Sequence, residues 1–497
     1  MGGMPAVPSV SNSITVRLEL PARATAVSEL TTLIERCGGL LTALDVTASG
    51  HDRLQIDVTV AARDTPHADD IVEAIRGLDG IEIGKVSDRT FLMHLGGKLK
   101  VESKVPIRNR DDLSLIYTPG VARICLAIAA NPDDARRLTI KRNTVAVVTD
   151  GSAVLGLGNL GPLAALPVME GKAALFKRFA GIDAFPICLD TQDTDEIVAA
   201  VRAIAPGFAG INLEDISAPR CFEVERRLRE VLDIPVFHDD QHGTAIVALA
   251  ALRNALRVVG KALPDVRIVM SGAGAAGTAI LRLLLKAGAR HVVVADVHGV
   301  VHAAREDILR ADDSNLCWVS EHTNPEGLSG TLREALVGAD VFIGVSAPNL
   351  LTGDDIATMN DGSIVFAMAN PDPEVDPAEA ARYAAVVATG RSDFANQINN
   401  VLVFPGVFRG LLDAGSTDVS DEVLLAAAEA LSEVVSPDQL NPAYIVPSVF
   451  NPDVSKVVAA AVEAVARSAR SARSAPSPGT SPVGRRTPVD LAEVVGT

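Results

Sequence analysis

The sequence predicts an α/β protein that has a small ferredoxin-like unit followed by two larger parallel-sheet domains. Three observations support this: the first part alternates four strands with two helices, short apolar strands alternate with helices from about residue 144, and a glycine-rich turn follows one later strand. Near-continuous apolar strands separated by helices are typical of parallel sheets covered on both faces. We therefore expect a ferredoxin-like N-terminal domain, an α/β domain and a domain of the Rossmann type.

The first unit, residues 13–90, has the order strand, helix, strand, strand, helix, strand. Residues 14–20 alternate apolar and polar at period two, as in a strand with one buried face. A helix is expected from Ala26 to Cys37, where Gly38-Gly39 ends it. The remaining elements are expected at 40–47, 53–60, 67–77 and 81–86. This order is the split βαβ pattern of ferredoxin-like domains.

Charge and composition exclude several kinds of partner. The chain has 45 Lys and Arg against 62 Asp and Glu, a formal net charge of −17 over 497 residues. So acidic a chain repels nucleic acid and anionic lipid, and we expect neither as a partner. There is no secretory signal and no run of about 18 apolar residues that would predict a spanning helix. Five scattered cysteines without a CxxC pair predict reduced thiols and a cytoplasmic protein.

A G-x-G-x-x-G pattern lies between a strand at 266–270 and the helix that follows it. There the glycines allow a tight turn, and the helix N-terminus receives a pyrophosphate. An aspartate ends the next strand, where it accepts hydrogen bonds from ribose hydroxyls and repels a 2′-phosphate. This aspartate favours NAD over NADP. The strand, helix and aspartate together favour a dinucleotide-binding site over a merely glycine-rich turn. The candidate cofactor-binding residues are Gly272, Gly274, Ala275, Ala276, Gly277 and Asp296.

Four carboxylates follow two predicted parallel strands. Glu214 and Asp215 come after the strand at 210–213, and Asp239 and Asp240 come after the next. Open α/β sheets bind ligands at the carboxyl ends of their strands. Converging carboxylates repel each other unless a divalent cation neutralises them, and all-oxygen ligation indicates Mg²⁺ or Mn²⁺. The alternative is that each pair caps the helix that follows it.

Three further polar features have both a chemical and a structural interpretation. Lys172 begins an apolar helical stretch, where a desolvated amine could act as a base, although helix lysines are usually solvated. Tyr117 precedes a Pro-Gly turn and could point its hydroxyl into a cleft, or it could simply be packed. Asn370, Asn399 and Asn400 follow or precede late strands, and their amides could bind a carboxylate or a nicotinamide, or serve as turn residues.

Taken together, these motifs resemble the malic enzyme family in its shorter bacterial form. Eight ordered stretches carry the resemblance across most of residues 100–450. They are YTPGVA at 117–122, VTDGSAVLGLGNLGP at 148–162, PVMEGKAALFKRFAGIDAFPI at 167–187, NLED at 212–215, HDDQHGTA at 238–245, SGAGAAG at 271–277, MANPDPE at 368–374 and NQINNVLVFPG at 396–406. The unit in front of them resembles an ACT regulatory domain.

The resemblance implies oxidative decarboxylation of (S)-malate to pyruvate and CO₂ with reduction of NAD. It implies that Tyr117 is the general acid, Lys172 the general base, and Asp239 a carboxylate that supports the lysine. Glu214, Asp215 and Asp240 match the metal ligands, while Asn370 and Asn400 match residues that touch substrate or nicotinamide. Eukaryotic members carry an arginine for the substrate carboxylate where this chain has Ala153, so Ser152 or a backbone amide would have to replace it.

The expected organisation has five parts. They are an ACT-like regulatory domain at 1–92, a substrate and metal domain at 93–240, a Rossmann NAD-binding domain at 241–430, C-terminal helices packing on the catalytic body at 431–465 and a basic, Pro/Ser-rich disordered tail at 466–497. We expect a homodimer or higher homo-oligomer, with a small-molecule effector possible at the ACT-like domain.

Three other functions stay open at this point. A malolactic-type enzyme would retain NAD and release lactate. An amino-acid dehydrogenase also pairs a lysine with a nucleotide-binding domain, but it would not need the carboxylate site. An ACT-based sensor would carry an inactive catalytic body. Metal dependence and the appearance of NADH separate these alternatives from a malic enzyme.

Overall fold

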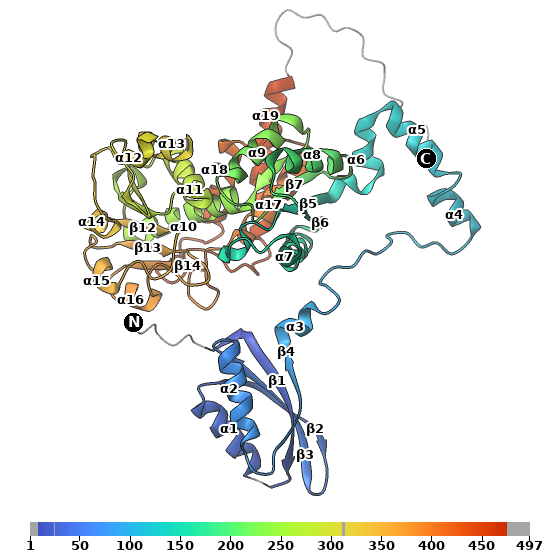
Figure 1. The fold of residues 1–497 in the computed structure, drawn as a ribbon. Helices are drawn as coiled ribbons and strands as arrows, with labels where there is room; N and C mark the ends of the chain where they lie inside the picture. The colour runs from blue at the N-terminus through green and yellow to red at the C-terminus, as the bar shows by residue number, and fades with distance from the viewer. Residues whose placement is uncertain (1–7, 24, 311–313, 475–497) are drawn as a thin grey trace, which may run out of the picture. The chain divides into compact units, whose positions relative to one another are not determined.

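The computed structural model describes residues 8–474 except for residues 24 and 311–313. The chain divides into two units, Met1–Glu102 and Ser103–Thr497 (Figure 1). The first unit thus ends at Glu102 rather than at the expected residue 92.

The first unit has the predicted order of strands and helices. Its antiparallel sheet has the strand order β2-β3-β1-β4, which is that of a ferredoxin-like fold. Both main helices are amphipathic, and they pack residues such as Leu30 and Ile71 against Val16 and Val58 of the sheet. The elements are β1 (Ser9–Pro21), α1 (Ala26–Arg36), β2 (Leu40–Ser49), β3 (Arg53–Ala62), α2 (Thr65–Arg76), β4 (Glu82–Asp88) and the short α3 (Arg89–His94).

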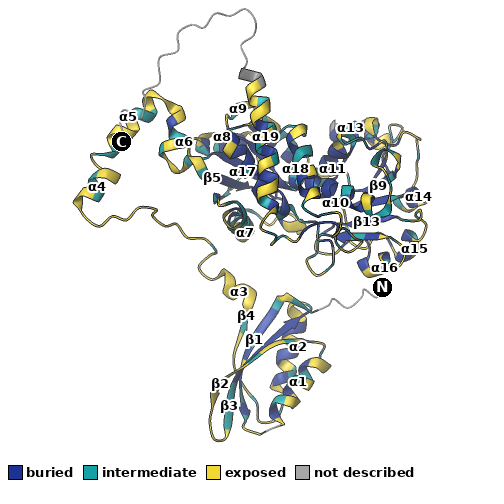
Figure 2. Ribbon diagram, turned by 180° about the vertical axis from the view of Figure 1, so that it is seen from behind, coloured by how far each residue is buried: buried dark blue, intermediate teal, exposed yellow. Residues whose placement is uncertain are grey.

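The second unit begins with helices that bury almost nothing. Neither α4 (Arg110–Ile116) nor α5 (Val121–Ala130) has a buried residue, and Figure 2 shows both largely in the colour of exposed residues. Residues 110–130 are apolar enough by composition to cross a membrane. They do not form one helix, however, because a turn with Pro119 separates α4 from α5. The short α6 (Ala135–Leu138) follows.

The next sheet is parallel and has the strand order β6-β5-β7-β8. Alternate residues of its central strand face two different cores: Val145 and Val147 pack toward α7 and α10, while Ala146 and Val148 pack toward α8 and α9. Both faces are therefore covered, as the apolar strand pattern predicts. The elements are β5 (Thr144–Thr149), α7 (Pro162–Ala180), β6 (Asp183–Cys188), α8 (Thr194–Ile204), β7 (Gly210–Leu213), α9 (Arg220–Val231), β8 (Val236–His238) and α10 (Thr244–Val259).

The last sheet has the strand order β11-β10-β9-β12-β13-β14, and all its pairs are parallel except β10 with the two-residue β11. Its helix-covered faces and its glycine turn after β9 give it the Rossmann arrangement that the sequence predicts. The elements are β9 (Arg267–Ser271), α11 (Ala275–Lys286), β10 (His291–Asp296), β11 (Gly299–Val300), α12 (Glu306–Arg310), α13 (Ser314–His322), α14 (Leu332–Leu336), β12 (Val341–Gly344), α15 (Gly353–Ile356), β13 (Ile364–Ala367), α16 (Pro377–Ala380) and β14 (Val386–Thr389).

Three C-terminal helices complete the body: α17 (Phe404–Ala414), α18 (Asp421–Glu433) and α19 (Val454–Ser474). The expectation of a disordered tail from residue 466 is wrong for 466–474, because α19 continues to Ser474. Ala466 is fully buried, and the guanidinium of Arg467 donates to the carbonyl of Asp413 (3.0 Å) at the end of α17. Alanine and arginine are good helix formers, so the repeated Ala-Arg-Ser extends the helix. Residues 475–497 lie outside the described residues.

Candidate active site

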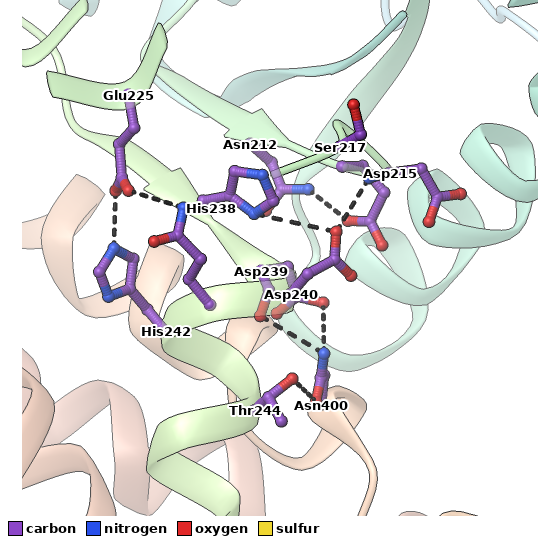
Figure 3. Close-up of polar contacts among 12 residues, drawn as sticks. Asn212, Asp215, Ser217, Glu225, His238, Asp239, Asp240, His242, Thr244 and Asn400 are labelled. Atoms are coloured by element: carbon purple, nitrogen blue, oxygen red, sulfur yellow. Dashed lines mark hydrogen bonds and ion pairs between the residues drawn. The ribbon is translucent and has the colours of Figure 1, made fainter. Parts of the chain in front are cut away.

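The ends of two neighbouring parallel strands bring the predicted carboxylates together. β5, β7 and β8 are neighbours that run in the same direction, so the residues after them meet at one edge of the sheet. Glu214 and Asp215 follow β7, while Asp239 and Asp240 follow β8 in a five-residue π-helical turn, Asp239–Gly243. Figure 3 shows Asp215, Asp239 and Asp240 pointing into one region. π-Helical turns occur frequently at functional sites.

Glu214, Asp215 and Asp240 can each supply one oxygen to a common metal ion, since these atoms all lie within 4.8 Å of one another. Asp215 has a φ of 54°, a left-handed conformation that aspartate tolerates better than most residues. Its amide N–H donates to Oδ2 of Asp240 (2.9 Å), and its own Oδ2 is buried without a partner. The trio is thus held in place with at least one ligand atom free.

The electrostatics of the trio fit a divalent cation. Burial, and next the charge of Asp240, raise the pKa of Asp215 to about 7. Burial also raises the pKa of Glu214 well above its usual value, despite the nearby Lys172. Burial and the neighbouring carboxylates both disfavour the ionised forms, and a positive charge bound among these oxygens would offset both effects. A hard cation such as Mg²⁺ or Mn²⁺ would supply it through oxygen ligands alone, which is the donor set that the site offers.

Lys172 lies on α7 and points its amine at this cluster. Its Nζ is 2.5 Å from Oδ2 of Asp239 and 2.8 Å from Oε1 of Glu214, and 11% of its side chain is exposed. The amine also lies 4.4 Å from the ring centre of Phe404. Burial lowers the pKa of Lys172, but Asp239 and Glu214 outweigh burial and raise it overall. Lys172 is therefore not a solvated helix lysine, whereas Lys177 pairs with Asp183 at the surface.

Several contacts fix Asp239, the partner of Lys172. The amide of Asn400 donates to Oδ2 of Asp239 (3.3 Å), and Oγ1 of Thr244 donates to Oδ1 of Asn400 (3.1 Å), as Figure 3 shows. A Cβ at position 243 would lie 2.0 Å from Oδ1 of Asp239, so only glycine fits there. Asn400 thus joins the C-terminal part of the chain to the lysine–carboxylate pair.

A buried glutamate that sequence analysis missed supports the same turn. Glu225 on α9 accepts from Nε2 of His242 (2.7 Å), as Figure 3 shows, and from the amide of Gln241 (3.2 Å). It also pairs with Arg229 (2.6 Å). Burial raises the pKa of Glu225, but His242 and Arg229 lower it to about 2. The carboxylate therefore stays ionised and holds the turn that carries Asp239 and Asp240.

The predicted nucleotide site is a cleft of about 650 Å³ at the carboxyl end of β9. Gly272 has a φ of 109°, and a Cβ there would lie 2.8 Å from the carbonyl of Val345, so this turn requires glycine. α11 begins at Ala275, directly after the turn, and its N-terminus can receive a phosphate. The cleft is lined by Gly272, Ala273, Gly274, Asp296, Ser346 and Leu350, among others.

Asp296 lies in this cleft but is not alone there. The guanidinium of Arg305 binds both its oxygens, at 2.8 and 2.6 Å, and binds Asp307 as well. The sequence predicts this carboxylate because it ends a strand, whereas its pairing with Arg305 depends on the fold of the loop that follows. Asp296, Arg305 and Asp307 together carry one negative charge, so this part of the cleft still disfavours the 2′-phosphate of NADP.

The three asparagines occupy different positions. Asn370 is exposed after β13, and its amide lies over Gly390, whose Cβ would be 3.1 Å from Oδ1 of Asn370. Asn399 caps the short helix that follows it, since its Oδ1 accepts from the N–H of Val401 (3.0 Å). Asn399 therefore acts as a turn residue, which is the structural alternative that the sequence left open.

Two further residues from the sequence predictions, Tyr117 and Ser152, are not hydrogen-bonded to Lys172 in the described part of the chain. Tyr117 ends α4 with 68% of the residue exposed, and no hydrogen bond or ion pair among the described residues joins its hydroxyl to Lys172. Ser152, beside Ala153, donates to Asp150 (2.6 Å) and accepts from the N–H of Ser217 (2.9 Å). Arg220 pairs with Asp150 (2.8 Å), so a cation lies near this loop although the expected arginine is missing.

This fold and this site define a class of protein. A carboxylate trio beside a buried lysine, next to a Rossmann domain with a nucleotide cleft, is the arrangement of a metal-assisted, nicotinamide-dependent oxidoreductase. Comparison with known proteins identifies the family within this class. Residues 96–229 match the family "Malic enzyme, N-terminal domain", and residues 241–467 match "Malic enzyme, NAD binding domain".

Individual relatives agree. The chain is 55% identical over 459 residues to a Geobacillus stearothermophilus protein named NAD-dependent malic enzyme, covering 92% of this chain and 95% of the relative. It is 52% identical to a Bacillus subtilis bifunctional malic/malolactic enzyme, covering 74% and 90%. The crystal structure of an NAD-dependent malic enzyme from Thermotoga maritima superposes with a TM-score of 0.73 at 46% identity, covering 76% and 99%. The chain belongs to the malic enzyme family.

Proposed function

We propose that this malic enzyme oxidises (S)-malate with NAD and releases pyruvate and CO₂. The observation that carries the proposal is Lys172, held between Asp239 and Glu214 beside the three carboxylates. A base, a cation site and a hydride-acceptor cleft are the three parts that this reaction needs. An amino-acid dehydrogenase would not need the carboxylate trio.

Each part of the site has one role in the proposed reaction. A bound divalent cation supplies Lewis-acid stabilisation of charge on substrate oxygens, and NAD supplies the hydride acceptor. Lys172 takes the proton from the C2 hydroxyl as hydride leaves C2. Once Glu214, Asp215 and Asp240 are neutralised, less negative charge surrounds the amine, so its pKa falls toward the range of a useful base. Asp239 and Asn400 keep the amine in position.

Asn370 and Tyr117 complete the proposed site, the first by contact with substrate or nicotinamide and the second by supplying the final proton. We place Asn370, which is exposed where the Rossmann domain meets Gly156, against substrate or nicotinamide. A Cβ on Gly156 would lie 2.9 Å from the carbonyl of Asn370, so the two domains approach closely here. We place Tyr117 as the acid that protonates C3 after CO₂ has left.

Tyr117 reaches the site, in our proposal, through a second copy of this chain. α4 and α5 expose apolar side chains such as Leu115 (75%) and Leu126 (72%), which is costly in water. A partner copy that covers these helices would bury them and bring one copy's Tyr117 to the other copy's Lys172. A mixture of Tyr117→Phe and Lys172→Ala chains, dissociated and reassociated, would then recover activity that neither variant has alone. Activity that stays absent in mixed dimers would contradict the exchange.

The first unit is, in our proposal, an ACT-like regulatory domain in a cytoplasmic enzyme. Its ferredoxin-like sheet is the fold that such a domain requires. The alignment with the Geobacillus relative covers 92% of this chain. The residues left unaligned are fewer than those of the first unit, Met1–Glu102, so at least part of this unit aligns with the relative. The ligand that we propose here is a small effector such as an amino acid or a metabolite.

The test of the main proposal is product stoichiometry. Malate, NAD and Mn²⁺ should give NADH, pyruvate and CO₂ in equal amounts, and a chelator should abolish all three. Lactate without net NADH would show the malolactic reaction instead. Metal-independent turnover, or no turnover of malate, would contradict the proposal.

A further inference from the structure

Glu374 is a fully buried carboxylate in the Rossmann domain, four residues after Asn370 in the MANPDPE stretch. It pairs with no cation among the described residues. Instead, its Oε1 accepts from the backbone N–H of Ser346 (2.8 Å), and its Oε2 accepts from the backbone N–H of Ala369 (3.1 Å). Burial raises the pKa of Glu374, while hydrogen bonds from these two N–H groups, from its own N–H and from the Ser346 hydroxyl (3.5 Å) oppose the rise.

The two N–H groups belong to two different loops of the cleft. Ser346 follows β12 and lines the cleft, and its hydroxyl hydrogen-bonds to that of Ser271 (2.7 Å), directly before the glycine turn. Ala369 follows β13 and directly precedes Asn370. One carboxylate therefore joins the loop on the cofactor side to the loop that carries Asn370.

Further contacts make this arrangement specific. The backbone carbonyl of Glu374 accepts from the N–H of Leu351 (2.9 Å), so the segment is bound to the β12 loop at a second point. A Cβ on Gly344 would lie 2.4 Å from the carboxyl carbon of Glu374, so the strand end leaves room for this side chain only because it is glycine.

We propose that Glu374 is a positioning residue that sets Asn370 against the bound nicotinamide and substrate by joining the β12 and β13 loops. This inference rests on the proposed function, in which Asn370 contacts substrate or nicotinamide. Glu374 itself touches neither, because its side chain is buried beneath the loops. Its effect on catalysis passes through Asn370.

Glu374→Gln separates this role from packing. Glutamine fills the same volume but has one carbonyl oxygen and one amide NH₂, so it can accept from one of the two N–H groups only. The other backbone N–H would then face the NH₂ group of the glutamine, which is also a donor. A backbone N–H cannot rotate to find another acceptor, so one hydrogen bond is lost. The β12 and β13 loops would lose their common partner while the core stays filled.

The experiment is a double-mutant cycle on kcat/KM for malate, with Glu374→Gln, Asn370→Ala and the double variant at saturating NAD and Mn²⁺. The control for loss of charge alone is Asp376→Asn, because the N-cap Asp376 accepts from two backbone N–H groups of α16 through one oxygen, Oδ1, which asparagine keeps. NADH affinity by fluorescence and the thermal midpoint are measured for every variant.

We expect Glu374→Gln to lower kcat/KM at least tenfold in the wild-type background and less than threefold in the Asn370→Ala background. Asp376→Asn should change it less than threefold. Equal factors in both backgrounds would show that Glu374 does not act through Asn370, and an Asn370→Ala variant of normal activity would also overturn the proposal. If Glu374→Gln does not fold, the same cycle with Glu374→Asp, which keeps the charge but is one methylene shorter, replaces it.

If the wild-type protein does not convert malate, the proposed function fails, which is a separate result. Glu374 can then still be tested by NADH affinity. A loss of at least threefold in Glu374→Gln but not in Asp376→Asn would support its role in the cleft, and unchanged affinity would contradict it.

Discussion

Asp296→Ser tests whether the carboxylate at the end of β10 sets the preference for NAD. In the structure Asp296 lines the cleft with 14% of its side chain exposed, and Arg305 binds both its oxygens. Arg305 is also held by Asp307 at 2.6 Å, so its guanidinium is not free to bind a 2′-phosphate. Serine at position 296 would remove the charge nearest the ribose.

The size of the effect follows from Coulomb's law. Two unit charges about 5 Å apart at an effective dielectric constant of about 20 repel by about 3 kcal/mol. Solvent and salt reduce this, and each 1.4 kcal/mol is a factor of ten. We therefore expect Asp296→Ser to shift the ratio of kcat/KM for NAD to kcat/KM for NADP by ten- to a hundredfold toward NADP.

The assay is steady-state kinetics with both cofactors at saturating malate and Mn²⁺, and Asp307→Asn is the control. Asp307 pairs with the same arginine but is not among the residues that line the cleft. Asp307→Asn removes the same formal charge as Asp296→Ser, and we expect it to shift the ratio of the two kcat/KM values by less than tenfold. An unchanged ratio in Asp296→Ser, or a wild-type preference for NADP of tenfold or more, would refute the reasoning. An equal shift in both variants would assign the preference to net charge rather than to contact.

Three other variants test the active site and the domain boundary. Lys172→Ala should lower kcat at least about 100-fold, since a positioned base contributes about that much or more, while the surface variant Lys177→Ala should not. Near-normal turnover at pH 7.5 would remove Lys172 from the mechanism. Asp240→Asn should lower activity steeply and recover only partly at high Mn²⁺; a Mn²⁺ dependence like that of the wild type would mean that the carboxylates only cap helices. A chain that begins at His94 should stay soluble, oxidise malate and lose its response to effectors, because the second unit has its own core; an insoluble product would make the first unit part of the catalytic body.

The parts of the site that the sequence predicts best are contiguous in the chain. The glycine turn, its helix and Asp296 follow one another around one β-α-β unit, so local pattern places them together. The carboxylates could be placed as well, because the ends of parallel strands lie at one edge of a sheet. No local pattern predicts the approach of Lys172 to Asp239, 67 residues apart; only the family resemblance implied it, and the packing of α7 beside the sheet produces it.

What the sequence could not show depends on side chains meeting from separate elements. Glu225 is one acidic residue in a charged helix, and only the fold reveals that it is buried against His242. The pairing of Arg305 with both Asp296 and Asp307 likewise depends on how the loop after β11 turns. The helical end of α19 was missed because its composition resembles a disordered tail, while burial of Ala466 against the body decides the outcome.

The most direct test of the central claim, that three carboxylates hold a divalent cation beside Lys172, is anomalous diffraction at the manganese edge. The measurement uses crystals of the full chain grown with Mn²⁺ and NADH. We expect one strong peak per chain, from an ion bonded to oxygens of Glu214, Asp215 and Asp240 and close to the amine of Lys172. A peak at other residues, or no peak at saturating Mn²⁺, would contradict it.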